Sequence, residues 1–228
     1  MKGASAILIP AYNEEKNIGD IVEGSLKFSP YVIVVDDGSK DRTSEVARKY
    51  RAIVLRHEKN GGKGEALRTG FNHVLKNMKS VKGVIIIDAD NQYPASEIPA
   101  IMKPLETDEA DVVMGARDWD RVPLRHRLGN FVWRFFFNLL FGTSLKDTNC
   151  GLIGLSRRAL DVMGSSYGGY IIENFILAKA VENKLRIMNV PVNVRYNRVS
   201  GIVRGSRMVL GNFVFIIQEG IRYRLGRK

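Results

Sequence analysis

Two acidic turns carry the residues of this sequence that are best suited to chemistry. In DADNQYP (88–94), Asp88 and Asp90 are two residues apart, and Gln92 follows two residues later. Crowded carboxylates repel each other unless a cation or hydrogen-bond donors separate them. Two carboxylates and an amide oxygen form an all-oxygen donor set, which suits Mg²⁺ or Mn²⁺. The spacing therefore favours a divalent metal site that binds a substrate's phosphates, with a solvated turn as the alternative for this motif taken alone.

The other acidic turn, DDGSKD, starts at Asp36 at the end of an apolar run. Acidic residues at such strand ends bind the ribose in dinucleotide folds, so Asp36 or Asp37 is a candidate for contact with a base or a ribose. A plain turn with Gly38 in the left-handed conformation is the alternative. Downstream, NGGKGEA (60–66) suits a close backbone approach to phosphate, with Lys63 as a point charge. It lacks the spacing of a P-loop, so ATP hydrolysis is not expected.

The elements that position these turns alternate between short apolar runs and helical patterns, which is typical of parallel β-α units. The apolar runs are continuous, as expected for strands that are buried on both faces. Strands are expected at 4–10, 31–36, 52–56, 81–88 and 111–115, and helices at 14–27, 41–50, 62–78, 95–105 and 128–142. The predicted fold class is α/β, a single domain with a mostly parallel central sheet flanked by helices.

In such a sheet the ligand crevice lies outside the carboxyl ends of the strands. Every conspicuous polar group of the first half follows a predicted strand, so we expect these groups on that one edge. They are Tyr12, Glu14, Asp36, Asp37, Asn60, Lys63, Asp88, Asp90, Gln92 and Arg117.

Composition sets the limits of the interpretation. The chain has 228 residues, of which 45% are hydrophobic, so it has enough apolar surface for one core. Its single cysteine, Cys150, excludes an internal disulfide. The formal net charge of +11 favours an anionic partner such as a nucleic acid, a nucleotide or an acidic membrane surface.

Five motifs follow one another over the first half: PAYNE (10–14), VVDDGSKD (34–41), NGGKG (60–64), DADNQYP (88–94) and GAR (115–117). Together they resemble glycosyltransferase family 2, and within it dolichol-phosphate mannosyltransferase and dolichyl-phosphate glucosyltransferase. The similarity continues more weakly through DTNCGL (147–152), Glu173 and the basic segment 198–207. Asn91 and Tyr93 depart from the family pattern, which usually has an apolar residue and a His or Asp at these positions.

The resemblance implies a Rossmann-like nucleotide-diphospho-sugar transferase domain of the glycosyltransferase A type over residues 1–228. Residues 1–117 would bind the nucleotide and the metal, and residues 118–228 would bind the acceptor and meet a membrane. Asp90 and Arg117 would be catalytic. The nucleotide sugar would be bound by Pro10, Tyr12, Glu14, Asp36, Asp37, Lys63, Asp88, Ala89 and Asp90, and Mg²⁺ or Mn²⁺ by Asp88, Asp90 and Gln92.

The implied reaction is the inverting transfer of a hexose, mannose or glucose, from GDP-mannose or UDP-glucose to dolichyl or polyprenyl phosphate. A phosphate monoester is ionised near neutral pH because its second pKa is about 6, so this acceptor needs no general base. Positive charge is needed instead, to bring two anions together. The candidates for binding the acceptor phosphate are Arg117, Arg125, Arg127 and Arg134, followed in the late basic segment by Arg198, Arg204 or Arg207.

Segment 128–142 predicts a helix with apolar residues over most of its circumference and with Asn130, Arg134 and Asn138 in a thin polar stripe. Such a helix is either enclosed by protein or lies in a bilayer interface, and both interpretations stay open. The segment is too short to span a membrane, and Arg134 interrupts it. Four basic residues near the C-terminus contribute at most about 4 kcal/mol at an anionic surface, so charge alone does not anchor the chain.

We therefore expect a peripheral protein on the cytoplasmic face of a membrane, without a transmembrane helix, held by apolar insertion or by a membrane-anchoring subunit. The same catalytic core with a soluble or carbohydrate acceptor is one alternative, and the apolar helices and late arginines argue against it. A basic nucleic-acid-binding module is another. Acidic clusters at the ligand edge would repel nucleic-acid phosphates unless a metal intervened, so nucleic acid is not an expected partner.

Overall fold

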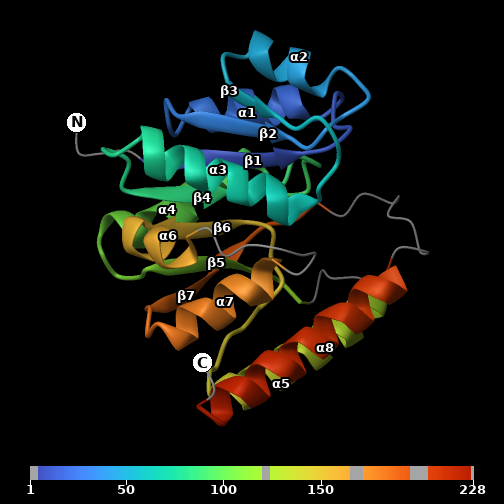
Figure 1. Cartoon of the computed structure of the whole chain (residues 1–228), viewed down its shortest axis with the longest axis vertical. Coiled ribbons are helices and arrows are strands. Elements are labelled where there is room, and N and C mark those ends of the chain that lie inside the picture. The colour runs from blue at the N-terminus through green and yellow to red at the C-terminus, as the bar shows by residue number, and fades with distance from the viewer. Residues whose placement is uncertain (1–4, 120–123, 165–171, 196–204, 227–228) are drawn as a thin grey trace.

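A computed structural model describes residues 5–119, 124–164, 172–195 and 205–226, without the side chains at 124–126, 128 and 205–210. Figure 1 shows a central sheet covered by helices and a pair of long helices, α5 (Leu124–Phe141) and α8 (Gly205–Arg224), that projects away from it. The two halves of the sequence contribute strands to the same sheet, so the described residues form a single α/β domain.

The described strands form a seven-stranded sheet in the order β3-β2-β1-β4-β6-β5-β7. They are β1 (Ala6–Ala11), β2 (Val32–Asp36), β3 (Ile53–Arg56), β4 (Gly83–Ile86), β5 (Val112–Arg117), β6 (Ile153–Ser156) and β7 (Ile187–Val192). β6 runs antiparallel to both of its neighbours, and the other pairs are parallel. The predicted mostly parallel sheet is therefore confirmed, and the carboxyl ends of the parallel strands share one edge.

Helices cover both faces of this sheet. They are α1 (Ile18–Leu26), α2 (Thr43–Lys49), α3 (Lys63–Asn77), η1 (Ala95–Glu97), α4 (Ile98–Glu106), α6 (Arg157–Met163) and α7 (Ile172–Glu182), besides α5 and α8. α3, α6 and α7 lie side by side on one face, and α1 and α4 pack on the other (Figure 1). This double cover explains why every residue of the apolar strands β1, β2 and β4 is buried.

Close packing of α3 on the sheet depends on a glycine. A Cβ added at Gly70 would lie 2.3 Å from Cδ1 of Leu8 in β1, so a larger residue would push helix and strand apart. The N-terminus of α3 carries Lys63, and the tight packing holds that end of the helix at the carboxyl edge of the sheet.

Several expectations about the elements were wrong in detail. The helix expected from residue 14 begins at Ile18, because residues 14–17 form a turn in which the Glu14 carbonyl accepts hydrogen bonds from the N–H groups of Asn17 and Ile18. β6, α6, α7, β7 and α8 were not predicted from the sequence. β6 is a four-residue run inserted between β4 and β5, and a run this short carries little periodic signal.

Helix α5 begins at Leu124 rather than at 128. Two of its polar side chains face the protein, whereas several large apolar ones face outward. Asn130 is buried, and Asn138 hydrogen-bonds the backbone of Leu145, so the polar stripe faces the protein. Phe137 and Phe141 are buried beside it, whereas the other aromatic face points outward. Three large side chains on that face are about half exposed, namely Phe131, Phe135 and Leu139.

Helix α8 packs along α5 (Figure 1) and carries exposed apolar side chains of its own. Phe136 and Phe213 meet edge to face with ring centroids 5.1 Å apart, and Phe141 stacks on Tyr223 at 5.4 Å. Among the side chains of α8 that the structure describes and that of Leu225 just after it, the large exposed apolar ones are Val214, Ile221, Tyr223 and Leu225. Within the described ranges, no helix is both long enough and apolar enough to cross a membrane.

Candidate active site

The first acidic turn holds its two carboxylates with bonds from the protein itself. Asp36 is fully buried, and its Oδ1 accepts a hydrogen bond from the Ser39 N–H at 2.8 Å while its Oδ2 accepts one from Ser44. Asp37 is 3% exposed and accepts hydrogen bonds from two backbone N–H groups, those of Gly61 at 2.9 Å and Gly62 at 2.6 Å. Contact of either aspartate with a nucleotide stays a prediction.

Asp37 thereby shapes the glycine loop that precedes α3. Gly62 has a φ of 90°, a conformation in which glycine is strongly favoured, and it is the residue just before the helix. His57 adds a further link, because its ring nitrogens lie 2.7 Å from Asp37 Oδ1 and 2.8 Å from Thr69 Oγ1. The turn, the loop and the helix form one connected unit, and this unit places Lys63 in the first turn of α3.

Lys63 lies between two carboxylates from distant parts of the sequence. Its Nζ is 2.7 Å from Asp88 Oδ1 and 2.7 Å from Glu173 Oε1. Burial lowers the pKa of Lys63, but the charges of Asp88 and Glu173 outweigh burial and raise it above its usual value. The ammonium is therefore held in its charged form. Glu173 lies in the first turn of α7, where a negative charge is favourable.

Further carboxylates surround this pair. Burial raises the pKa of Glu14, a hydrogen bond from Asn17 lowers it, and the nearby charges of Asp90, Asp41 and Asp88 raise it. Burial also raises the pKa of Asp88, with Glu173 and Asp90 acting in the same direction and Lys63 opposing them. The carboxyl edge of the sheet is thus a place of concentrated negative charge, which a cation would relieve.

The second acidic turn contains the residues expected to bind a metal. Asp90 Oδ1 accepts a hydrogen bond from the Gln92 N–H at 3.0 Å, and Asn91 between them has a φ of 59°. Among the described residues, no group of three or more His, Cys, Asp or Glu side chains is arranged to hold a metal ion. Mg²⁺, however, is commonly held by one or two carboxylates together with waters and substrate phosphates. The oxygen donors of Asp88, Asp90 and Gln92 fit an ion of this kind.

A loop from the second half of the chain packs against the second acidic turn. A Cβ added at Gly151 would lie 2.1 Å from Asp88 Oδ2 and 3.1 Å from the Tyr93 ring, so only glycine leaves Asp88 in place. The Gly151 N–H donates to the Tyr93 hydroxyl at 3.1 Å. Tyr93, which departs from the family pattern, is therefore a structural support for this loop. Burial raises the pKa of the neighbouring Cys150 to about 12, so this thiol stays neutral.

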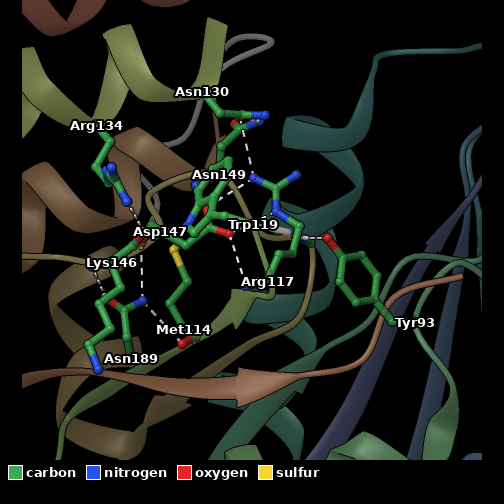
Figure 2. Close-up of polar contacts among 11 residues, drawn as sticks. Tyr93, Met114, Arg117, Trp119, Asn130, Arg134, Lys146, Asp147, Asn149 and Asn189 are labelled. Atoms are coloured by element: carbon green, nitrogen blue, oxygen red, sulfur yellow. Dashed lines mark hydrogen bonds and ion pairs between the residues drawn. The ribbon is translucent and has the colours of Figure 1, made fainter. Parts of the chain in front are cut away.

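The other end of the same loop binds Arg117, the last residue of β5. Asp147 accepts two hydrogen bonds from the guanidinium, at 2.7 Å from Nε and 2.9 Å from an Nη, and Asn130 of α5 accepts a third at 3.3 Å (Figure 2). The Arg117 side chain is 11% exposed and that of Asp147 is 1% exposed. Arg117 is thus a paired cation fixed in one orientation.

Arg134 lies beside this pair in a different environment. Its guanidinium lies 5.2 Å from the centre of the Trp119 ring, to which Arg117 also lies close at 5.4 Å, and it donates to the Lys146 carbonyl at 3.0 Å (Figure 2). The structure gives Arg134 no acidic partner within the residues it describes. Its described contacts are thus one carbonyl and two aromatic rings, those of Trp119 and Phe131.

The structure brings most of the predicted site residues to one edge of the sheet, including Glu14, Lys63, Asp88, Asp90 and Arg117. Of the remaining ones, Pro10 and Ala89 are buried, and Tyr12 is 39% exposed after β1. Arg127 lies in α5. The predicted roles of Arg198 and Arg204 fall outside the described residues, as do the side chains of Arg125 and Arg207.

Several residues of this site were not predicted from the sequence. No contact was predicted between the arginines and Asp147, Trp119 or Asn130, and no role was predicted for Glu173. The motif DTNCGL was the available signal, because it begins with Asp147 and contains Gly151. Its importance depends on contacts to residues 30 or more positions away, which the motif alone does not reveal.

Comparison with known proteins agrees with this geometry. The family described as Glycosyl transferase family 2 matches residues 6–164. UDP-N-acetylglucosamine–dolichyl-phosphate N-acetylglucosaminyltransferase from Methanococcus voltae is 30% identical, with 92% of each chain covered. Polyprenol monophosphomannose synthase from Mycolicibacterium smegmatis is 27% identical over 97% of this chain and 88% of the relative.

Among solved structures, glucosyl-3-phosphoglycerate synthase from Mycobacterium tuberculosis in complex with Mn²⁺, UDP-glucose and phosphoglyceric acid shares the fold. The TM-score is 0.79 at 22% identity, and the match covers 96% of this chain and 80% of that one. The family match spans more than half of the chain, and the M. voltae relative is 30% identical with 92% of each chain covered. The chain therefore belongs to glycosyltransferase family 2.

Proposed function

We propose that this glycosyltransferase transfers a hexose from a nucleotide diphosphate sugar to dolichyl or polyprenyl phosphate, with inversion at the anomeric carbon and with a divalent cation. The names of the M. voltae and M. smegmatis relatives support a polyprenyl phosphate acceptor. The fold neighbour, solved with Mn²⁺ and UDP-glucose, makes UDP-sugars candidate donors beside GDP-mannose.

The observation that carries the proposal is the loop 147–151, which connects two half-sites. The donor half-site contains the carboxylates of Asp88 and Asp90, and the acceptor half-site contains Arg117 and Arg134. At one end, Asp147 fixes Arg117, and at the other end, Gly151 packs against Asp88. A donor bound at the carboxylates and a phosphate bound at the arginines would then meet across this loop. Such a pairing of half-sites is what transfer between two anionic substrates requires.

At the donor half-site, Asp88, Asp90 and Gln92 would hold Mg²⁺ or Mn²⁺. When bound, the ion would neutralise the charge that develops on the departing nucleoside diphosphate. Pro10, Tyr12, Glu14, Asp36, Asp37 and Ala89 are proposed to line the nucleotide pocket around this turn.

At the acceptor half-site, Arg134 is the proposed first contact of the lipid phosphate. Its charge lacks an acidic partner among the described side chains, whereas Asp147 already neutralises Arg117. Arg117 would stabilise the phosphate through its hydrogen-bonding edge rather than through a free charge. A general base is not required, because the phosphate is itself the ionised nucleophile.

The outward apolar face of α5 and α8 is the proposed contact with the bilayer. Phe131, Phe135 and Leu139 are exposed on a helix whose polar side chains face the protein, the reverse of a helix that meets water. The enzyme would act as a peripheral protein on the cytoplasmic face, with Arg222 and Arg224 near the headgroups and with or without an anchoring subunit. Insertion of this face would bring Arg134 toward the lipid phosphate.

The test is a transfer assay with three labelled donors, UDP-glucose, UDP-N-acetylglucosamine and GDP-mannose, each offered a short-chain polyprenyl phosphate with Mn²⁺ or with EDTA. Transfer of label from one donor into the lipid, dependent on the cation, is the expected result. A parallel reaction offers phosphoglyceric acid in place of the lipid, and labelling of this acid without labelling of the lipid would favour a soluble acceptor. Label released only as free sugar would refute both acceptors.

A matched pair of arginine variants tests the acceptor half-site. Arg134→Ala is expected to raise the KM for the prenyl phosphate at least tenfold while leaving the KM for the donor unchanged. Arg158→Ala is the control, because Arg158 is 62% exposed and lies near Asp111 at the opposite edge of the sheet. Equal kinetics for the two variants would remove Arg134 from the acceptor site.

A further inference from the structure

The ammonium of Lys63 binds a carboxylate, Asp88, that the proposed metal site needs as a ligand. Its Nζ lies 2.7 Å from Asp88 Oδ1, on one of the two carboxylates of the proposed metal site. The same ammonium lies 2.7 Å from Glu173 Oε1, so the first turns of α3 and α7 are joined through one charge. These two helices lie on the same face of the sheet (Figure 1), although Lys63 and Glu173 are 110 residues apart in sequence.

Both oxygens of the Asp88 carboxylate have close neighbours, and Oδ1 is bound by this ammonium. Its Oδ2 lies against Gly151, where even one added carbon would come within 2.1 Å. A divalent ion that binds Asp88 through Oδ1 would therefore compete with Lys63 for this oxygen. Lys63 is able to move, because its side chain is flexible and 30% exposed.

Glu173 can hold the Lys63 ammonium after it leaves Asp88. It already binds Lys63 directly and is proposed here neither as a metal ligand nor as an acceptor ligand. With Asp88 taken by a metal, Lys63 would keep one carboxylate partner and would remain charged beside the donor pocket. Without Glu173, the ammonium would have only Asp88 as its described partner.

We propose that Lys63 is a built-in counter-ion of the metal site, which occupies Asp88 until a divalent cation displaces it, and that Glu173 is the positioning residue that retains the displaced ammonium. This inference rests on the metal dependence in the proposed function. Its consequence is an order of binding. The lysine weakens metal binding to the empty enzyme, so the cation enters together with the nucleotide, whose phosphates supply further ligands.

The test measures Mn²⁺ binding to the full chain without nucleotide, from the electron paramagnetic resonance signal of free Mn²⁺. Lys63→Met is expected to bind Mn²⁺ about tenfold more tightly than the unmodified chain, a change of about 1.4 kcal/mol. Lys63→Arg keeps the charge and is expected to resemble the unmodified chain. Lys63→Gln is a second neutral variant and is expected to behave like Lys63→Met, with thermal unfolding as the check on folding.

Glu173 is tested with and without the lysine. Glu173→Gln is expected to weaken Mn²⁺ binding about threefold, because Lys63 then stays on Asp88. The double variant Lys63→Met/Glu173→Gln is expected to match Lys63→Met alone. If Glu173→Gln weakens binding equally in both backgrounds, the glutamate acts through its own charge and the retaining role is wrong.

The outcomes separate this inference from the proposed function. If the unmodified chain binds Mn²⁺ and the neutral Lys63 variants bind it equally or more weakly, the counter-ion role is overturned and the metal dependence stands. If none of the variants binds Mn²⁺ without nucleotide, the counter-ion role is overturned, and the metal dependence fails with it only if the addition of UDP restores no binding. Asp88→Asn serves as the binding control and is expected to abolish binding in each background.

Discussion

Replacing Gly151 by alanine is the sharpest test of the donor half-site, because it adds one carbon at a place where the structure has no room. The new Cβ would lie 2.1 Å from Asp88 Oδ2 and 2.8 Å from its Cγ, whereas ordinary contacts begin at 3.4 Å. The Asp88 carboxylate must therefore retreat by about 1 Å, or the loop must lift by a similar distance. Lys63 occupies the other side of the carboxylate, so neither movement is free.

Two magnitudes follow from this displacement. Overpacking a well-packed site typically costs about 1–3 kcal/mol of the free energy of unfolding. A misplacement of about 1 Å at a reacting centre can cost about 10²-fold in rate. This rate loss corresponds to about 2.7 kcal/mol of transition-state stabilisation, since each tenfold is 1.36 kcal/mol. We expect Gly151→Ala to show both effects, together with weaker Mn²⁺ binding.

The assays are urea unfolding, Mn²⁺ titration and the sugar-transfer reaction, each run beside a second glycine variant. Gly129→Ala is the matched control, because a Cβ at Gly129 in α5 would meet no atom within 4 Å. Helix propensity predicts that this control is stabilised by up to about 1 kcal/mol. Wild-type Mn²⁺ affinity and turnover in Gly151→Ala would refute the placement of Asp88 in the metal site and the reasoning built on it.

Four further predictions concern the supporting structure and the outward face of α5. Asp147→Asn leaves Arg117 buried without its ionic partner and should cost about 3–5 kcal/mol of the free energy of unfolding, measured in urea; an unchanged transition would contradict the pairing. Phe137→Ala, at a fully buried ring, should cost about 3–5 kcal/mol. Phe135→Ala, at an exposed ring, should change stability by less than about 0.5 kcal/mol but reduce flotation with anionic vesicles, and unchanged flotation would count against the membrane face. Hydrogen bonds from Arg186 lower the pKa of Asp111 from 3.8, so this pair stabilises the fold above about pH 4 and the stabilisation is lost as pH falls through the lower, folded-state pKa. Between pH 6 and pH 3, the free energy of unfolding should therefore fall less in Asp111→Asn than in the unmodified chain. Asp161→Asn is the control, because its side chain is mostly exposed, and it should behave like the unmodified chain.

The sequence by itself determined the parallel part of the fold and the edge that carries the chemistry. Continuous apolar runs marked β1, β2 and β4, because strands buried on both faces need apolar side chains at every position. Polar turns directly after these runs then had to lie at the carboxyl ends of the strands. Both inferences depend on consecutive residues and on a general rule of sheet topology, so they did not need the path of the whole chain.

The tertiary structure decided which charges are paired and which are free. Lys63 meets Glu173 across 110 residues, and Arg117 meets Asp147 across 30. It also placed β6 between β4 and β5, and it turned the polar stripe of α5 toward the protein and three large apolar side chains outward. The physical reason is that periodicity belongs to neighbouring residues, whereas the partner of a charge or of a helix face depends on how distant segments pack together.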